Sequence, residues 1–250
     1  MIKYTKEIDE VKILLPEQTS QKKYRFEKNF VEIINKRKQI TKIIRTVTIR
    51  FSGIENDKWR FQIVCHSQEI VAEHIGSITI LQLRDTIFNE IIIYVNQNGI
   101  ILSVLNLKQI QELWQTVKND LRKKHEGQVL ENFFYRTNAI VASTESILKY
   151  LDSKEMYGLY FNGCWGFHNI QKPRFAELHI IIEKRIQHDM HNQHLQRAYS
   201  HDAQLIIKKE TETKKQYCEL MYSSNNLDEA FLETQEENKN SKYSIVCLTK

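Results

Sequence analysis

Alternating hydrophobic and polar positions predict a first β-hairpin over residues 46–64. Residues 46–51 alternate strictly, and residues 58–64 alternate again after a turn that contains Gly, Asn and Asp. Strict alternation places every second side chain on one face of a strand, and two such runs around a short turn are typical of a hairpin. Trp59, Phe61 and Ile63 would then share one face of the second strand.

The same pattern predicts two more hairpins. Residues 91–95 and 100–105 are apolar runs joined by Asn96-Gln97-Asn98-Gly99. Asn-Gly favours this turn because both residues tolerate a positive φ. Residues 204–210 and 216–222 form the third hairpin. The remaining strand predictions are a short strand and turn over 157–165, a strand over 175–186 and a closing strand over 243–248.

Two helices are predicted between the hairpins. Apolar residues recur at helical spacing from residue 107 to residue 121, which indicates one amphipathic helix. Asn106 is placed to cap its first turn, and Gly127 to end it. Residues 128–150 repeat the helical spacing and predict a second helix. Together they predict a helical hairpin.

Two segments allow either secondary structure. In residues 22–45, Phe26 and Phe30 fit a helical stripe, while Val31 and Ile33 fit the alternation of a strand. We favour a helix there. Residues 223–241 are interpreted as an acidic connection that holds one short helix over 227–232.

The order of these elements predicts an α+β fold, with antiparallel β hairpins flanking a central helical hairpin. We expect residues 1–250 to form a single compact α+β domain. Its parts would be a basic amino-terminal segment (1–44), β hairpins (45–105), the helical hairpin (106–151) and a second β-rich part (157–250) with polar loops at 187–202 and 223–241.

Composition supports a folded protein of the cell interior. The chain has 250 residues, of which 41% are hydrophobic and 27% charged, which is typical of a globular domain. Its cysteines, Cys65, Cys164, Cys218 and Cys247, form no CxxC pair, so we expect free thiols. No segment resembles a signal peptide or an apolar membrane span. We therefore expect a cytoplasmic protein with no membrane span.

Basic residues concentrate near the amino terminus. The first fifty residues contain thirteen Lys and Arg against six Asp and Glu, whereas the whole chain has a net charge of +5. Such a segment can contact a polyanion, with aromatic side chains as stacking surfaces. An ordinary solvated face is the alternative that we favour. The candidate contacts to a partner or polyanion are Lys22, Lys23, Arg25, Lys36, Arg37 and Lys38.

Histidines provide the one candidate metal site. His188, His191, His194 and His201 fall within fourteen residues, next to Asp202. Imidazole and carboxylate groups are common zinc ligands. However, no HExxH motif is present, and glutamines lie among the histidines. We therefore favour the interpretation that the segment is a solvated polar loop.

A short segment carries the only resemblance to an enzyme. Cys164-Trp165-Gly166-Phe167 resembles the nucleophile segment of papain-like cysteine peptidases. The resemblance covers four residues and would imply that Cys164 is a nucleophile, with a downstream histidine as its partner. The following residues, 169–173, are poor helix formers, whereas the family places a long helix there. An aromatic corner of the core is the interpretation that we favour.

Neither a GxSxG motif nor a phosphate-binding glycine loop occurs. We therefore expect a non-enzymatic interaction or structural protein that needs no cofactor and binds a protein partner within an intracellular complex. The first alternative is a metal-dependent or cysteine hydrolase built on residues 188–202, with help from Cys164 or His168. The second alternative is nucleic-acid binding through the basic amino-terminal segment.

Overall fold

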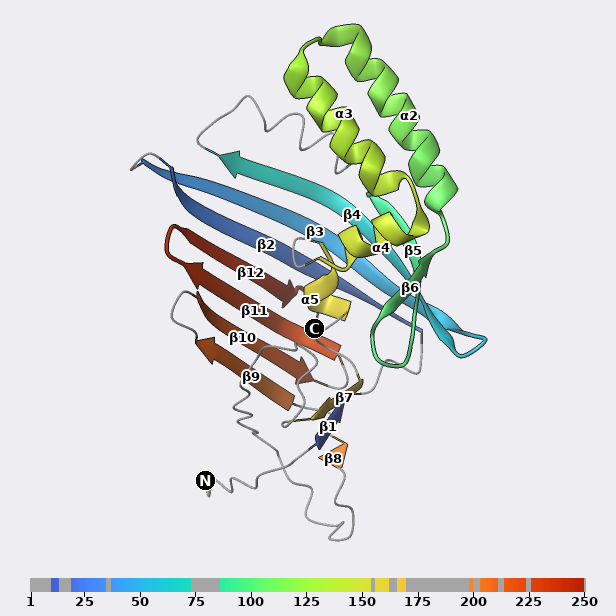
Figure 1. The fold of residues 1–250 in the computed structure, drawn as a ribbon. Helices are drawn as coiled ribbons and strands as arrows, with labels where there is room; N and C mark the ends of the chain where they lie inside the picture. Colours follow the sequence, from blue (N-terminus) through green and yellow to red (C-terminus); the bar gives the residue numbers. More distant parts are fainter. Residues whose placement is uncertain are drawn as a thin grey trace.

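The structure is a computed structural model that describes residues 10–13, 19–34, 37–72, 86–153, 156–161, 166–169, 198–199, 203–210, 214–223 and 226–249. Most of these residues belong to strands (Figure 1). The strands are β1 (Glu10–Ile13), β2 (Ser20–Ile34), β3 (Arg37–Glu55), β4 (Lys58–Ala72), β5 (Glu90–Val95), β6 (Ile101–Val104), β7 (Gly166–Asn169), β8 (Ala198–Tyr199), β9 (Ala203–Glu210), β10 (Lys214–Ser223), β11 (Asn226–Glu236) and β12 (Lys239–Cys247). The helices are α2 (Leu107–Lys124), α3 (Gln128–Val141), α4 (Thr144–Leu151) and α5 (Gly158–Phe161).

Nine strands form one antiparallel sheet in the order β6-β5-β4-β3-β2-β12-β11-β10-β9. The pairing of β2 with β12 joins the amino-terminal and carboxyl-terminal strands, with Phe26 opposite Ile245. A smaller sheet has the order β7-β1-β8, in which β1 pairs antiparallel with β7 and parallel with β8. The α+β class with an antiparallel sheet is therefore confirmed.

Strand alternation gives the large sheet two different faces. The inner face carries buried side chains such as Tyr24, Val47 and Phe61. It packs against the helices, which lie on one side of the sheet in Figure 1. Aromatic rings make the contact: Tyr24 lies 5.3 Å from Tyr160 and Phe61 lies 5.3 Å from Phe161, between ring centroids. The opposite, outer face is mostly polar, and its side chains range from half-buried to exposed.

All three hairpin predictions are confirmed. β3 and β4 contain the predicted hairpin at 46–64, and both strands extend well beyond it. β5 and β6 form the hairpin around Gly99, which has a φ of 79°. β9 and β10 form the third hairpin, and β12 covers the predicted closing strand as far as Cys247.

The helix predicted over 22–45 is wrong, because these residues form most of β2 and the first half of β3. Phe26 and Phe30 are four residues apart, a spacing that fits one helix face and also one strand face. Tyr24 and Phe26 are buried while Lys23 and Arg25 are exposed, so the alternation decides in favour of a strand.

Residues 227–232 are also not helical. They lie in β11, where Ala230 and Leu232 are buried on the inner face. Thus 223–241 is not one polar loop but includes nearly all of β11 and the start of β12.

The second predicted helix is divided into two. α3 ends at Val141, and Ser143 caps α4 by accepting a hydrogen bond from the Ser146 amide at 3.1 Å. Within the predicted strand 157–165, residues 158–161 form the short helix α5 instead. Among the described helices, none combines the length and the apolar composition that a membrane crossing requires. The predicted strand at 175–186 lies outside the described residues.

Candidate functional site

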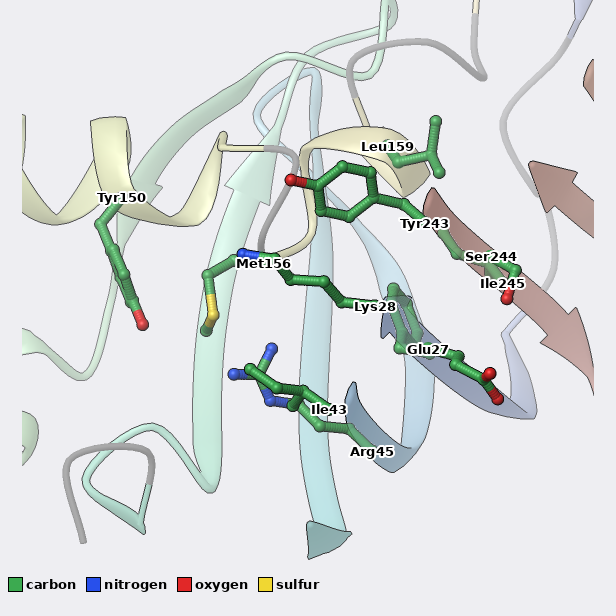
Figure 2. A pocket seen from close by; sticks show the side chains of 11 residues that line it. Glu27, Lys28, Ile43, Arg45, Tyr150, Met156, Leu159, Tyr243, Ser244 and Ile245 are labelled. Carbon is green, nitrogen blue, oxygen red and sulfur yellow. The ribbon is translucent and has the colours of Figure 1, made fainter. Parts of the chain in front are cut away.

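The candidate site is a recess between the inner face of the sheet and the α4–α5 segment (Figure 2). Three neighbouring strands, β3, β2 and β12, form its floor. Residues from the end of α4 to the start of α5 cover it. The recess is lined by Phe26, Glu27, Lys28, Ile43, Arg45, Tyr150, Met156, Leu159, Tyr243, Ser244 and Ile245.

Strand register brings two cations to this floor. Phe26 pairs with Arg45, and Lys28 pairs with Ile43 on one side and Tyr243 on the other. Paired residues point to the same face of a sheet. Lys28 and Arg45 are therefore diagonal neighbours on the inner face, and Figure 2 shows both side chains directed toward Met156.

Arg45 is held by its neighbour in β4. Its side chain is only 8% exposed, and Nε donates a hydrogen bond to Gln68 Oε1 at 2.9 Å. Arg45 and Gln68 are also a cross-strand pair. Burying a guanidinium is costly unless it is hydrogen bonded, so this bond both offsets the cost and fixes the direction of the planar group.

Two aromatic rings lie close to the Lys28 ammonium. Lys28 Nζ lies 5.6 Å from the ring centroid of Phe30 and 5.7 Å from that of Tyr243. These distances allow a cation–π attraction. Across the recess, Met156 and Leu159 are each 4% exposed and supply an apolar wall. The recess thus combines positive charge, phenol groups and apolar surface.

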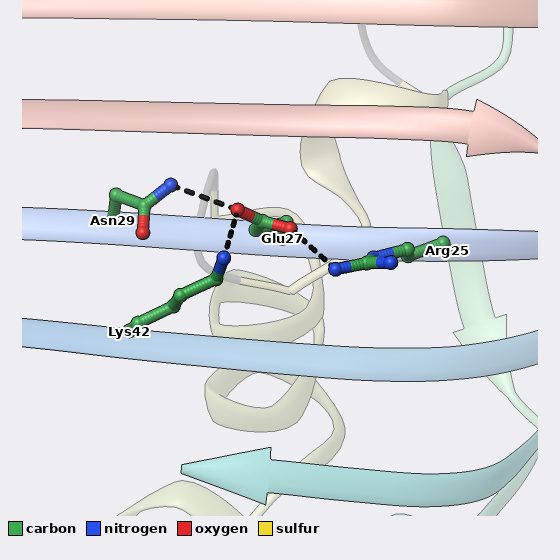
Figure 3. A network of polar contacts seen from close by, with 4 residues as sticks. All are labelled: Arg25, Glu27, Asn29 and Lys42. Atoms are coloured by element: carbon green, nitrogen blue, oxygen red, sulfur yellow. Dashed lines mark hydrogen bonds and ion pairs between the residues drawn. The ribbon is translucent and has the colours of Figure 1, made fainter. Parts of the chain in front are cut away.

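Glu27 lines the recess, but its carboxylate points to the other face (Figure 3). There it accepts hydrogen bonds from Lys42 Nζ at 2.8 Å, Arg25 at 3.0 Å and Asn29 at 3.0 Å. The Lys42 bond lowers the pKa of Glu27 most, and the bonds from Asn29 and Arg25 lower it further, against the opposing effect of burial. The recess therefore gains no negative charge from this residue.

A second half-buried carboxylate occupies the outer face on β11. Burial raises the pKa of Glu233, but hydrogen bonds from Gln235, Asn240 and Lys242 outweigh it, and the pKa is lowered. Lys242 Nζ lies 3.2 Å from its carboxylate. Lys242 pairs with Asn29 across β12 and β2, so these polar contacts extend across four neighbouring strands of the outer face.

The structure does not bring the predicted basic contacts together. Lys22 and Lys23 lie near the start of β2 on opposite faces, whereas Lys38 lies at the start of β3, beside the end of β2. Lys23 pairs with Thr48 and Lys38 pairs with Ile33. Ten residues of strand separate these ends, which is roughly 33 Å. Arg25 and Arg37 likewise fall at opposite ends, and Lys36 lies outside the described residues.

The predicted metal and nucleophile residues are largely outside the described part. Outside it lie the four histidines His188, His191, His194 and His201, and also Cys164. The backbone of His168 belongs to β7 and pairs with Val11. Within the described ranges, no group of three or more His, Cys, Asp or Glu residues could hold a metal ion. In the same ranges, Cys65, Cys218 and Cys247 form no disulfide.

Sequence reasoning missed the recess, because it depended on the helical interpretation of residues 22–45. A strand interpretation would have put Lys28 on the same face as Tyr24 and Phe26. It would not have found Tyr243, because nothing in the alternation of β2 and β12 indicates that they pair.

Comparisons with known proteins assign no family. The sequence matches no protein-family model and is similar to no curated protein. A solved structure described as "Lipid-protein interactions in lipovitellin" superposes on 97% of this chain with 6% sequence identity and a TM-score of 0.40. This chain spans 25% of that lipovitellin chain. A likeness at this TM-score carries no argument about fold or function.

Proposed function

We propose that the protein is a non-enzymatic interaction protein that binds a protein partner within an intracellular complex. We place the contact at one end of the outer face, on a surface that we call the distal patch. It consists of Val31, Ile33, Lys38, Ile40 and Val71.

Exposed apolar side chains on three adjacent strands carry this proposal. Ile33 on β2 is 50% exposed, Ile40 on β3 is 39% exposed, and Val71 on β4 is 53% exposed. Val31 pairs with Ile40, so the apolar residues are neighbours. Single exposed apolar residues are ordinary on a protein surface, but a contiguous group bordered by polar residues is typical of an interaction site.

Charge next to the patch favours an acidic partner. Lys38 pairs with Ile33 on the same face, whereas Lys42, which pairs with Val71, is already bound to Glu27 at 2.8 Å. Lysines at the rim of an apolar contact favour partners that carry carboxylates beside their apolar segment, and they raise the rate of encounter. The division of the other basic residues between two faces and two ends favours a protein surface over the regular phosphates of a nucleic acid.

Copurification with matched variants tests the proposal. We expect tagged wild-type protein from its native host to retain a partner, and the double variant Ile33→Thr/Ile40→Thr to retain at least about tenfold less. Threonine keeps the β-branched shape that suits a strand, so the variant loses apolar surface rather than fold. Ile54→Thr is the control, because Ile54 is 49% exposed near the other end of β3.

If the double variant Ile33→Thr/Ile40→Thr and the control Ile54→Thr retain the partner equally, the assignment of the contact to the distal patch is wrong. Retention that does not change between low and high salt would overturn the acidic character of the partner. No partner, together with about one equivalent of bound metal, would instead support the hydrolase alternative.

A further inference from the structure

We propose that the partner of the distal patch is a second copy of this chain, which packs outer face to outer face across a two-fold axis. This inference rests on the proposed function, because it names the partner of the surface assigned there. A two-fold interface brings the same patch of both copies together, so the patch must be complementary to itself. Opposite charges at its two ends and apolar side chains between them satisfy that condition.

Lys38 and Glu69 supply the opposite charges. Lys38 pairs with Ile33 at the end of β2, whereas Glu69 pairs with Ile44, six residues further along β3. Ile44 also pairs with Glu27, so Glu69 shares the outer face. At about 3.3 Å per residue, roughly 20 Å of strand separate the two charges. Both side chains are exposed, and neither has an ion-pair partner within the part of the chain that the structure describes.

Apolar side chains lie between these charges. Ile40 is two residues from Lys38 on β3, and Val71 is two residues from Glu69 on β4. A two-fold axis that crosses the strands midway between Ile40 and Val71 exchanges the two ends of the patch. Lys38 of each copy then faces Glu69 of the other, and the apolar centres meet. Sheets commonly pack face to face with their strand directions within about 30°.

The charges favour a second copy over an unrelated acidic protein. A second copy supplies a carboxylate for Lys38 and also a cation for Glu69. An acidic partner would satisfy Lys38 but would bring its own carboxylates close to Glu69, where like charges repel. Because a standard interface has roughly 20–30 residues per partner and the distal patch has far fewer, we expect a weak dimer with a Kd on the order of 10–100 μM.

Charge reversal tests the pairing. Sedimentation velocity of the purified protein from about 5 to 500 μM brackets the expected Kd. Lys38→Glu and Glu69→Lys each place like charges in both contacts of the dimer, and we expect each to weaken dimerisation at least about tenfold. In an equimolar mixture of the two variants, both contacts join opposite charges again. We expect a heterodimer with an affinity within about threefold of wild type, a recovery that misfolded variants would not show.

Arg50→Glu is the matched control, because Arg50 is exposed on the outer face near the other end of β3 and the charge change is the same. It should dimerise as wild type does. A wild-type monomer throughout the range, no recovery in the mixture, or equal weakening by Arg50→Glu would each overturn the dimer. If a monomeric wild type retains another protein through Ile33 and Ile40, the distal patch stands and only the two-fold dimer is wrong.

Discussion

At the scale of single residues, strand alternation decides what each charged group does. In β2, Arg25 and Glu27 belong to the polar network of the outer face, while Lys28, the next residue, faces the recess. Glu27 is the centre of that network, since its side chain is 18% exposed and accepts bonds from three residues on two strands. Such cross-strand contacts also help to fix the strand register.

Glu27→Gln removes the charge at this centre but keeps the shape. We expect the variant to lose about 1 kcal/mol of unfolding free energy at pH 7, because the hydrogen bonds to a charged acceptor weaken. Urea denaturation measures the loss. Glu229→Gln is the control, because Glu229 is exposed on the same face in β11, and it should change stability little. Equal losses in both variants would contradict a special role for Glu27.

The contact between Glu27 and Lys42 also makes the unfolding free energy depend on pH. The pKa of Glu27 in the folded state is lowered from its ordinary value of 4.5, first by Lys42. The carboxylate therefore stabilises the fold fully above that ordinary value, and the contribution is lost as the pH falls through the lowered pKa. We expect the difference between wild type and Glu27→Gln to shrink over that window in a pH series of denaturation curves. A difference that grows with acid would contradict this sign.

At the scale of elements, prediction succeeded where the apolar residues fitted only a strand alternation or only a helical repeat. It failed where they fitted both. The alternation at 46–51 excludes a helix, and the spacing of Ile110, Trp114 and Leu121 excludes a strand; both predictions are confirmed. Residues 22–34 fit both periods, and only pairing with β3 and β12 decides between them. The recess was not predictable for the same reason, because it combines side chains about 200 residues apart in sequence.

Asn106 shows that a correct boundary can have another cause. It precedes α2 as predicted, but it makes no side-chain capping bond. Instead Asn106 Oδ1 accepts from the Ile92 amide at 2.9 Å, and Nδ2 donates to the Glu90 carbonyl at 3.0 Å. The side chain thus attaches the start of α2 to β5.

The variant Asn106→Asp distinguishes a helix-capping role of this side chain from its role in attaching α2 to β5. Aspartate caps a helix as well as asparagine does, so a capping residue would tolerate the change. Here the aspartate would place a carboxylate oxygen against the Glu90 carbonyl, and we expect a loss of about 2 kcal/mol or more in unfolding free energy. Asn106→Ala should cost about as much. Wild-type stability for Asn106→Asp in thermal or urea unfolding would restore the capping interpretation.

At the scale of the whole molecule, one short segment brings aromatic side chains from the helices onto the sheet. Residues 156–161 turn back on the end of α4, where the Tyr157 amide donates to the Leu151 carbonyl at 3.0 Å. The turn carries Tyr157, Tyr160 and Phe161 onto the inner face. It also forms one wall of the recess, so the helix layer and the candidate site depend on the same turn.

Gly158→Ala should disrupt this join. A Cβ at Gly158 would lie 1.9 Å from the Asp152 carbonyl oxygen and 2.9 Å from that of Ser153. Both contacts are with backbone, so the turn must move and the aromatic contacts loosen. We expect a loss on the order of 3 kcal/mol, with near-UV circular dichroism reduced more than far-UV. An unchanged unfolding midpoint would show that the turn adapts without cost.

The strand order also determines when the sheet can be completed during synthesis. β2 lies in the middle of the sheet, yet its neighbour β12 follows about 200 residues later in the chain. At roughly 5–20 residues per second, a ribosome needs on the order of 10–40 s to supply that neighbour. Until then, β2 is an open strand edge, and open edges pair with other chains unless charges protect them. The lysines and arginines of β2, which the finished fold divides between two faces, would give the nascent chain that protection.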